Sequence, residues 1–259
     1  MLSRYGLRFA ALSYLTLLLV LPVAMVFRRA FENGVGAAWD AVTTPEAKHA
    51  FLITIVIALI AVPANTIFGI ACAIAIVRHR FPGKGLVNAI VDLPLALSPI
   101  VVGLSFLLLF GTGGWFAGVP FEVLFALPAM VLATIFVSLP FVVREVVPVL
   151  REIGTEQEQA AATLGAGPFQ TFFRVTLPAI RWGVIYGVIL TTARCLGEYG
   201  AVAVVSGKII GETETGTIFV ERAYQGFDKV GAYSMSVVLA LIAIATVAVM
   251  SLIKPRREA

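Results

Sequence analysis

Six long apolar segments decide what this chain can fold into. Each is close to or above the ~20 residues that a helix needs to cross the hydrocarbon of a bilayer. We predict membrane-spanning helices at about 9–26, 51–77, 86–110, 123–143, 183–205 and 231–253. Only 13% of the residues are charged, whereas soluble domains average about 25%. The sequence therefore predicts an all-α integral membrane protein with six transmembrane helices.

Basic residues indicate how the helices are oriented, because Lys and Arg collect on the cytoplasmic side of a membrane. If both termini and the segments 78–84 and 144–182 face the cytoplasm, twelve of the 19 Lys and Arg lie on that side. Six lie on the opposite side, and Arg194 falls within a predicted span. The first apolar run is longer than the apolar region of a typical signal peptide, which is about 7–15 residues, and this favours a retained anchor. We therefore expect a multi-pass protein of the inner (cytoplasmic) membrane with both termini inside.

Residue types that build catalytic or metal centres are scarce. The two cysteines lie inside apolar segments, and His49 and His79 are the only histidines, so neither a disulfide framework nor a zinc site is expected. The chain lacks the G-x-x-x-x-G-K-[ST] loop that cradles nucleotide phosphates. Its net charge of +4 arises from loops beside the membrane. We expect contact with membrane lipid, no nucleic acid, and no nucleotide site on this chain.

Residues 156–178 are polar although they lie between apolar segments. Helix formers fill 157–164, with Thr155 as the candidate N-cap, and Gly165 is expected to end that helix. A second short helix with an aromatic face is expected from Phe169 onward. Two short helices at an angle would form a knob, and a knob of this kind suits a groove on a soluble partner. We call residues 156–178 the knob.

The knob carries a spaced motif that resembles the cytoplasmic loop of ABC-importer permeases. It reads Q-A-A, three residues, G, nine residues, and then V-T-L-P. The family pattern is E-A-A, three residues, G, nine residues, and then I-x-L-P, so Gln159 replaces a Glu and Val175 an Ile. The resemblance implies that the knob couples the permease to an ATPase. The residues it assigns to this coupling are Glu156, Glu158, Gln159, Ala160, Ala161, Gly165, Leu177 and Pro178.

Other runs narrow the resemblance to the CysW-type permeases of sulfate/thiosulfate importers. They are D-L-P-L-A-L-S-P-I-V-V-G-L at 92–104, F-V-V-R-E at 141–145, V-T-L-P-A-I-R-W at 175–182, and the run from Thr192 to Gly207. The likeness covers about 50–250 and implies the type I ABC-importer permease fold. It also implies three parts: an N-terminal helix and outer segment at 1–48, a permease domain at 49–253 with its coupling loop at 144–182, and a cytoplasmic tail at 254–259.

The resemblance further implies an assembly. A second, CysT-type permease would pair with this chain, an ATP-binding subunit dimer would lie beneath both, and an extracytoplasmic sulfate-binding protein would deliver the anion. ATP and Mg would bind the partner ATPase, and this chain would hold no cofactor. It would thus be a transporter subunit and not itself an enzyme. Selectivity between sulfate, thiosulfate and other oxyanions would lie largely in the binding protein.

Polar and helix-breaking residues inside two predicted spans mark a candidate pathway. Pro94 and Pro99 remove helix hydrogen bonds, so the third span should be kinked or broken. An Arg at mid-membrane costs roughly 2.5–3.5 kcal/mol, and Glu198 stands four residues after Arg194, on the same helix face. The pair is either a structural ion pair or part of a gate. The candidate pathway residues are Arg194, Glu198, Ser98 and Pro99.

Other functions remain open at this point. A molybdate or tungstate importer permease, acting as a homodimer, has a similar tetrahedral oxyanion to move. A secondary transporter driven by ions would call for more intramembrane carboxylates or for repeated halves. A membrane-embedded enzyme would need a catalytic constellation beyond the single Arg–Glu pair, and a scaffold would not need the spaced motif.

Overall fold

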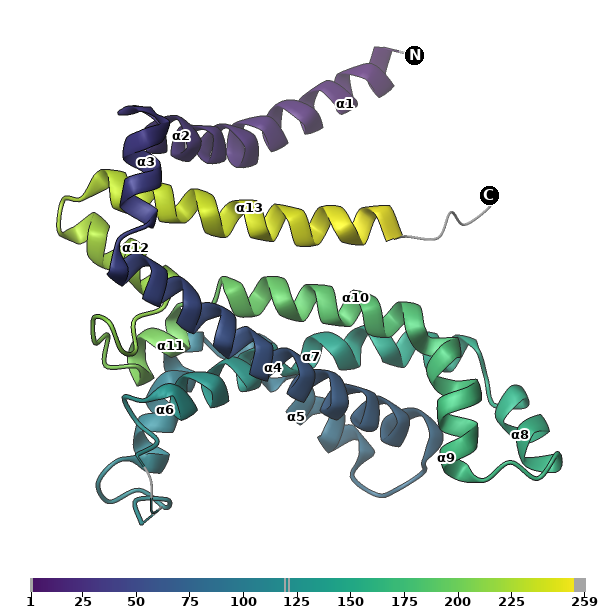
Figure 1. Cartoon of the computed structure of the whole chain (residues 1–259). Coiled ribbons are helices and arrows are strands. Elements are labelled where there is room, and N and C mark those ends of the chain that lie inside the picture. Colours follow the sequence, from purple (N-terminus) through teal and green to yellow (C-terminus); the bar gives the residue numbers. More distant parts are fainter. Residues whose placement is uncertain (1, 119, 121, 254–259) are drawn as a thin grey trace.

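The computed structural model describes residues 2–118, 120 and 122–253 and is built from helices joined by loops (Figure 1). The expected tail at 254–259 lies outside the described residues. In chain order the helices are α1 (Leu2–Leu15), the π-helical turn η1 (Thr16–Val20), α2 (Leu21–Ala30), α3 (Gly34–Val42), α4 (Pro45–Arg78), α5 (Lys84–Ala96), α6 (Pro99–Phe110), α7 (Leu127–Glu152), α8 (Glu156–Thr163), α9 (Pro168–Thr171), the π-helical turn η2 (Phe172–Thr176), α10 (Leu177–Leu196), α11 (Gly200–Val205), α12 (Gly216–Gln225) and α13 (Lys229–Ile253).

Five of the six predicted spans are present as membrane-crossing helices in the described chain, and the third is a bent helix pair that makes six if it counts as one span. Five helical stretches of the described chain are long and apolar enough to cross a membrane: Gly6–Ala30, Pro45–Arg78, Leu127–Glu152, Pro168–Leu196 and Lys229–Met250. The sixth is the pair α5 and α6, which bend by 110° at the residues between them. The third span is therefore not one straight helix, because Pro99 has no N–H to continue α5 and the preceding Ser98 is extended, with ψ 135°.

Several helix boundaries differ from the predicted spans. The second span begins earlier than expected, at Pro45, because Thr44 caps α4 and accepts a hydrogen bond from the Ala47 N–H at 3.2 Å. The fourth begins later, at Leu127, and continues to Glu152. The fifth helix begins and ends earlier in the chain than predicted, because it runs from Pro168 to Leu196. Hydropathy locates the part of a helix that lies in lipid, whereas a helix ends where its capping and breaking residues lie.

Helices α4, α7 and α10 meet at Val142 in the middle of α7. A Cβ built at Gly69 of α4 would lie 2.6 Å from Val142 Cβ, and one built at Gly187 of α10 would lie 2.8 Å from Val142 Cα. The G-x-x-x-G at 183–187 is therefore a close helix contact, as small residues allow in membranes. On α4 and α7, Asn65 Nδ2 also donates to Ser138 Oγ at 2.8 Å. These contacts fix the core of the bundle.

Gly187→Ala is expected to destabilise the protein, because the new methyl group meets the Val142 backbone, which cannot turn away. We expect a cost of about 1–3 kcal/mol, as for other overpacked cores, visible as a lower thermal midpoint of the purified protein in detergent. Gly85→Ala is the matched control, since a Cβ at Gly85 of α5 meets nothing within 4 Å. Equal midpoints for the two variants would mean that α7 and α10 do not approach closely.

The N-terminal helix lies at the edge of the bundle. Its second half, α2, packs against α13, while α1 extends away from the other helices (Figure 1). The start of α1, the end of α13 and α8 all lie toward one side of the molecule, and α3, α11 and α12 lie toward the other (Figure 1). This arrangement agrees with the expectation that both termini and the knob share one face of the membrane.

Candidate functional site

The knob begins with α8, which ends where the sequence predicts. Gly165 has φ +83°, a left-handed conformation that glycine adopts without strain, and its N–H donates to the Ala162 carbonyl. Thr155 occupies the N-cap position, but its side chain does not cap the helix; instead Gln159 Nε2 donates to Thr155 Oγ1 at 3.1 Å. The expected helix is therefore present, with a different arrangement at its start.

The second knob helix is not a separate element. Residues 168–196 form one continuous helical stretch in which α9 leads through the π-helical turn η2 into α10. The prediction of two independent short helices is therefore wrong, because between Phe169 and Leu177 no glycine or proline interrupts the chain. The knob consists of one short helix, a turn at 164–167, and the end of a transmembrane helix.

The knob exposes three large apolar side chains among polar ones. Leu164, Phe169 and Phe173 are largely exposed, and no residue of α8 is buried. Glu156, Gln159 and Ala160 are exposed as well, and Ala161 is half-buried. At the start of α10, Leu177 packs against the α4–α7 core and Pro178 is exposed. Apolar side chains of this size on an exposed turn are typical of a protein-binding surface.

Within the described residues, Glu158 is the one predicted coupling residue whose charged group has a hydrogen-bond or ion-pair partner on other helices. Its Oε2 lies 2.9 Å from Arg78 Nε at the end of α4, and its Oε1 accepts a hydrogen bond of 2.9 Å from Thr176 Oγ1. The Arg78 N–H does not point at the oxygen, so the contact is an ion pair without linear hydrogen-bond geometry. Sequence reasoning missed Arg78, although it is the first basic residue after the second apolar segment.

The candidate pathway residues come together around the short helix α11. A Cβ at Gly200, the first residue of α11, would lie 2.9 Å from Pro99 Cβ, so the break between α5 and α6 lies against this helix. Just before α11, Glu198 Oε1 accepts a hydrogen bond of 3.0 Å from the Ala201 N–H. Pro99 and Glu198 therefore both lie beside the first turn of α11, and Ser98 directly precedes Pro99.

Arg194 and Glu198 form the predicted ion pair although α10 ends between them. Arg194 Nη2 lies 2.9 Å from Glu198 Oε2, and the side chains are 34% and 2% exposed respectively. The Glu198 carbonyl also accepts from Thr217 Oγ1 of α12 at 2.8 Å. Contacts with α10, α11 and α12 therefore hold Glu198 in place, while about a third of the Arg194 side chain remains accessible.

Arg144 forms an ion pair with a carboxylate of another helix. It lies inside α7 and donates from Nε to Asp92 Oδ1 of α5 at 2.7 Å. The pair joins the first half of the broken span to α7.

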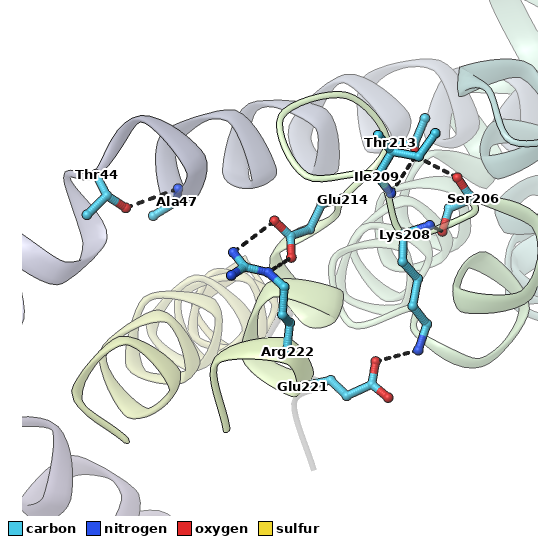
Figure 2. Close-up of polar contacts among 9 residues, drawn as sticks. All are labelled: Thr44, Ala47, Ser206, Lys208, Ile209, Thr213, Glu214, Glu221 and Arg222. Carbon is cyan, nitrogen blue, oxygen red and sulfur yellow. Dashed lines mark hydrogen bonds and ion pairs between the residues drawn. The ribbon is translucent and has the colours of Figure 1, made fainter. Parts of the chain in front are cut away.

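A polar cluster holds the loop 206–215 against α12 (Figure 2), toward the side of the molecule away from α8 (Figure 1). Glu214 is fully buried and receives two hydrogen bonds from Arg222, at 2.6 and 3.2 Å. Lys208 Nζ contacts Glu221 Oε2 at 2.7 Å and lowers the pKa of that carboxyl below its ordinary value. Both groups of this pair therefore stay charged near neutral pH. Sequence reasoning missed the cluster, because nothing in a polar loop shows that one carboxylate is buried.

A bundle of membrane helices with an exposed knob at one end is the arrangement expected of a transporter permease. The chain belongs to the family of binding-protein-dependent transport system inner membrane components, whose model matches residues 65–258. It is therefore an inner-membrane permease subunit of an ABC transporter.

Individual relatives refine this assignment. The chain is 49% identical over 257 residues to the sulfate transport system permease protein CysW of Synechocystis sp., covering 98% of this chain and 93% of that protein. It is 37% identical over 235 residues to the sulfate transport system permease protein CysT of Escherichia coli, covering 89% and 85%. A bacterial ABC transporter involved in alginate import has the same fold, with a TM-score of 0.79 at 15% identity and coverage of 98% and 96%.

Proposed function

We propose that the chain is the transmembrane permease subunit of an ATP-driven importer for sulfate or thiosulfate. One observation carries the proposal: the identity to a CysW sulfate permease extends over 98% of the chain. Identity to a CysT sulfate permease is lower than to the CysW permeases, 37% against 44–49%, which supports the CysW-type position for this chain. The relatives described above favour sulfate over the molybdate homodimer and over an ion-driven transporter.

The proposed assembly follows from the knob and from these relatives. A CysT-type permease pairs with this chain, an ATP-binding subunit dimer lies beneath the knob, and an extracytoplasmic sulfate-binding protein delivers the anion. ATP and Mg bind the ATP-binding subunits and not this chain. The exposed Leu164, Phe169 and Phe173 supply the apolar contacts that a groove on the ATP-binding subunit would bury.

Coupling is then a difference in contact free energy at the knob between two states of the transporter. ATP closes the ATP-binding dimer and displaces α8 together with the end of the Pro168–Leu196 stretch. Because that stretch is one helix from the knob to Leu196, displacement at one end reaches Arg194 near the other. The helices tip from inward-open to outward-open, and hydrolysis resets them.

The Arg194–Glu198 pair is the proposed anion-facing element of the pathway. Glu198 orients Arg194, and the accessible part of the guanidinium can donate to a tetrahedral oxyanion. Intramembrane charges of this kind mark transport routes more often than they serve packing alone. The broken α5–α6 span, with Ser98 and Pro99, borders the same region.

Identification of co-purifying proteins tests the assembly. The tagged protein is solubilised gently at native expression level and its partners are identified by mass spectrometry. We expect an ATP-binding subunit and a second, different permease. An ATP-binding subunit with this permease alone would favour the molybdate-type homodimer, and a preparation without any ATP-binding subunit would contradict the importer proposal.

A further inference from the structure

Apolar packing does not hold helix α8 in place. None of its residues is buried, and an open pocket of about 340 Å³ is lined by residues of α8 and of the transmembrane helices, among them Ile74, Arg78, Glu158, Ala162 and Phe172. Glycines with positive φ stand on both sides of the helix, Gly154 at +64° and Gly165 at +83°. Helix α8 is therefore a short helix between two glycine turns, next to an open pocket. Polar contacts, and not apolar packing, must fix its position.

Glu158 supplies that fixation. Among the described residues, its contacts with Arg78 and Thr176 are the only side-chain hydrogen bonds or ion pairs that tie α8 to the transmembrane helices. The Arg78 and Glu158 side chains are 12% and 22% exposed, so solvent screens the pair less than it screens a surface ion pair. The position of α8 therefore depends on one carboxylate.

Arg78 joins α8 to two further elements. Its Nη1 donates to the Leu150 carbonyl near the end of α7 at 3.1 Å, and its Nη2 donates to the Gly154 carbonyl at 2.6 Å. The guanidinium thus connects its own helix α4, the end of α7, the turn before α8, and α8 itself. Its planar, multidentate donor geometry suits such a junction, and a lysine could not reproduce it.

We propose that Arg78 is a positioning residue for energy coupling: it clamps α8 through Glu158 so that displacement of the knob moves α4 and α7. This inference rests on the proposed function, because it presumes an ATP-binding subunit that pushes on the knob. While the contact between Arg78 and Glu158 is intact, α8 cannot move into the adjacent pocket. Displacement of the knob is then transmitted to the core helices that meet at Val142. Without the contact between Arg78 and Glu158, the two glycine turns change conformation and the displacement of the knob does not reach α4 and α7.

The test uses the complete transporter, with its ATP-binding and partner permease subunits, in liposomes with labelled sulfate as the probe. The variants are Arg78→Ala, Glu158→Ala and the double variant, with Arg80→Ala as the matched control, because Arg80 is exposed and lies two residues away. Each is measured for ATP hydrolysis, for sulfate taken up per ATP hydrolysed, and for subunit composition.

We expect both single variants to lower sulfate uptake per ATP about tenfold or more while hydrolysis persists, and the double variant to be no worse than the poorer single one, as for two residues acting as a unit. Arg80→Ala should behave as wild type. A change limited to stability would lower the amount of assembled transporter without altering the ratio of uptake to hydrolysis, and that result would overturn the clamp.

Glu158→Gln is included in case an alanine variant fails to fold, because it removes the charge and keeps an acceptor for Thr176. Normal uptake per ATP in Glu158→Gln would overturn the proposal even if Arg78→Ala fails to assemble. Wild-type transporter that takes up no sulfate with ATP would instead refute the proposed function. Failure of the clamp and failure of the function are therefore distinguishable within one experiment.

Discussion

Gly165→Pro is expected to abolish sulfate uptake while the protein still inserts in the membrane and ATP is still hydrolysed. Gly165 has φ +83°, whereas proline fixes φ near −65°. The turn that follows α8 cannot form with proline, so Leu164 and Phe169 no longer share one docking surface. A Cβ at this position meets nothing within 4 Å, so any defect comes from the backbone conformation and not from a clash. The measurement is the ratio of uptake to hydrolysis in the reconstituted transporter.

Gly167→Pro is the matched control, because Gly167 has φ −72°, which proline adopts, and is equally open. A charged residue at the exposed Ala160, as in Ala160→Glu, should uncouple in the same way by obstructing the docking surface. If coupled transport survives both Gly165→Pro and Ala160→Glu, the assignment of the knob to coupling is wrong.

Arg194→Ala is expected to reduce uptake to background at normal levels of protein in the membrane. The substitution removes the only guanidinium that faces Glu198 in the described structure and leaves that carboxylate, 2% exposed, without its cation. If Arg194 has the proposed pathway role, uptake is lost because the anion no longer has this guanidinium as a hydrogen-bond donor. Uptake of labelled sulfate by cells or liposomes measures it, with protein level followed in parallel.

The double variant Arg194→Gln with Glu198→Gln separates a pathway role from a structural one. It removes both charges and leaves no unpaired carboxylate, so an ion pair that only fixes helix register should be dispensable. Continued loss of uptake in this variant supports contact between Arg194 and the anion. Full uptake by Arg194→Ala, or by the double variant, would refute the pathway role.

Hydropathy was sufficient to predict the helical membrane fold, because burial in lipid requires apolar residues along every span. The end of α8 could also be predicted, since Gly165 is a local signal for a left-handed turn. The pairing of Arg194 with Glu198 followed from their spacing of four residues, even though α10 ends at Leu196. Each of these features depends on residues that are neighbours in the sequence.

Features that join distant segments could not be predicted. Arg78 and Glu158 lie far apart in the chain, and neither is unusual in its own segment. The junction at Val142 needs glycines from two other helices, and a lone G-x-x-x-G is too common to identify it. The continuity of 168–196 was missed because the polar residues of the knob concealed a helix that extends beyond the lipid. Tertiary contacts decide such positions, and one sequence does not display them.

Sulfate uptake by the reconstituted transporter tests the central claim most directly. The chain, co-expressed with its ATP-binding and partner permease subunits, is placed in liposomes that contain ATP and Mg, and labelled sulfate is supplied outside with the extracytoplasmic binding protein. We predict uptake that requires ATP, requires the binding protein, and is inhibited by unlabelled sulfate more strongly than by molybdate. Uptake driven by an ion gradient in the absence of ATP, or ATP-driven uptake that prefers molybdate, would contradict the account.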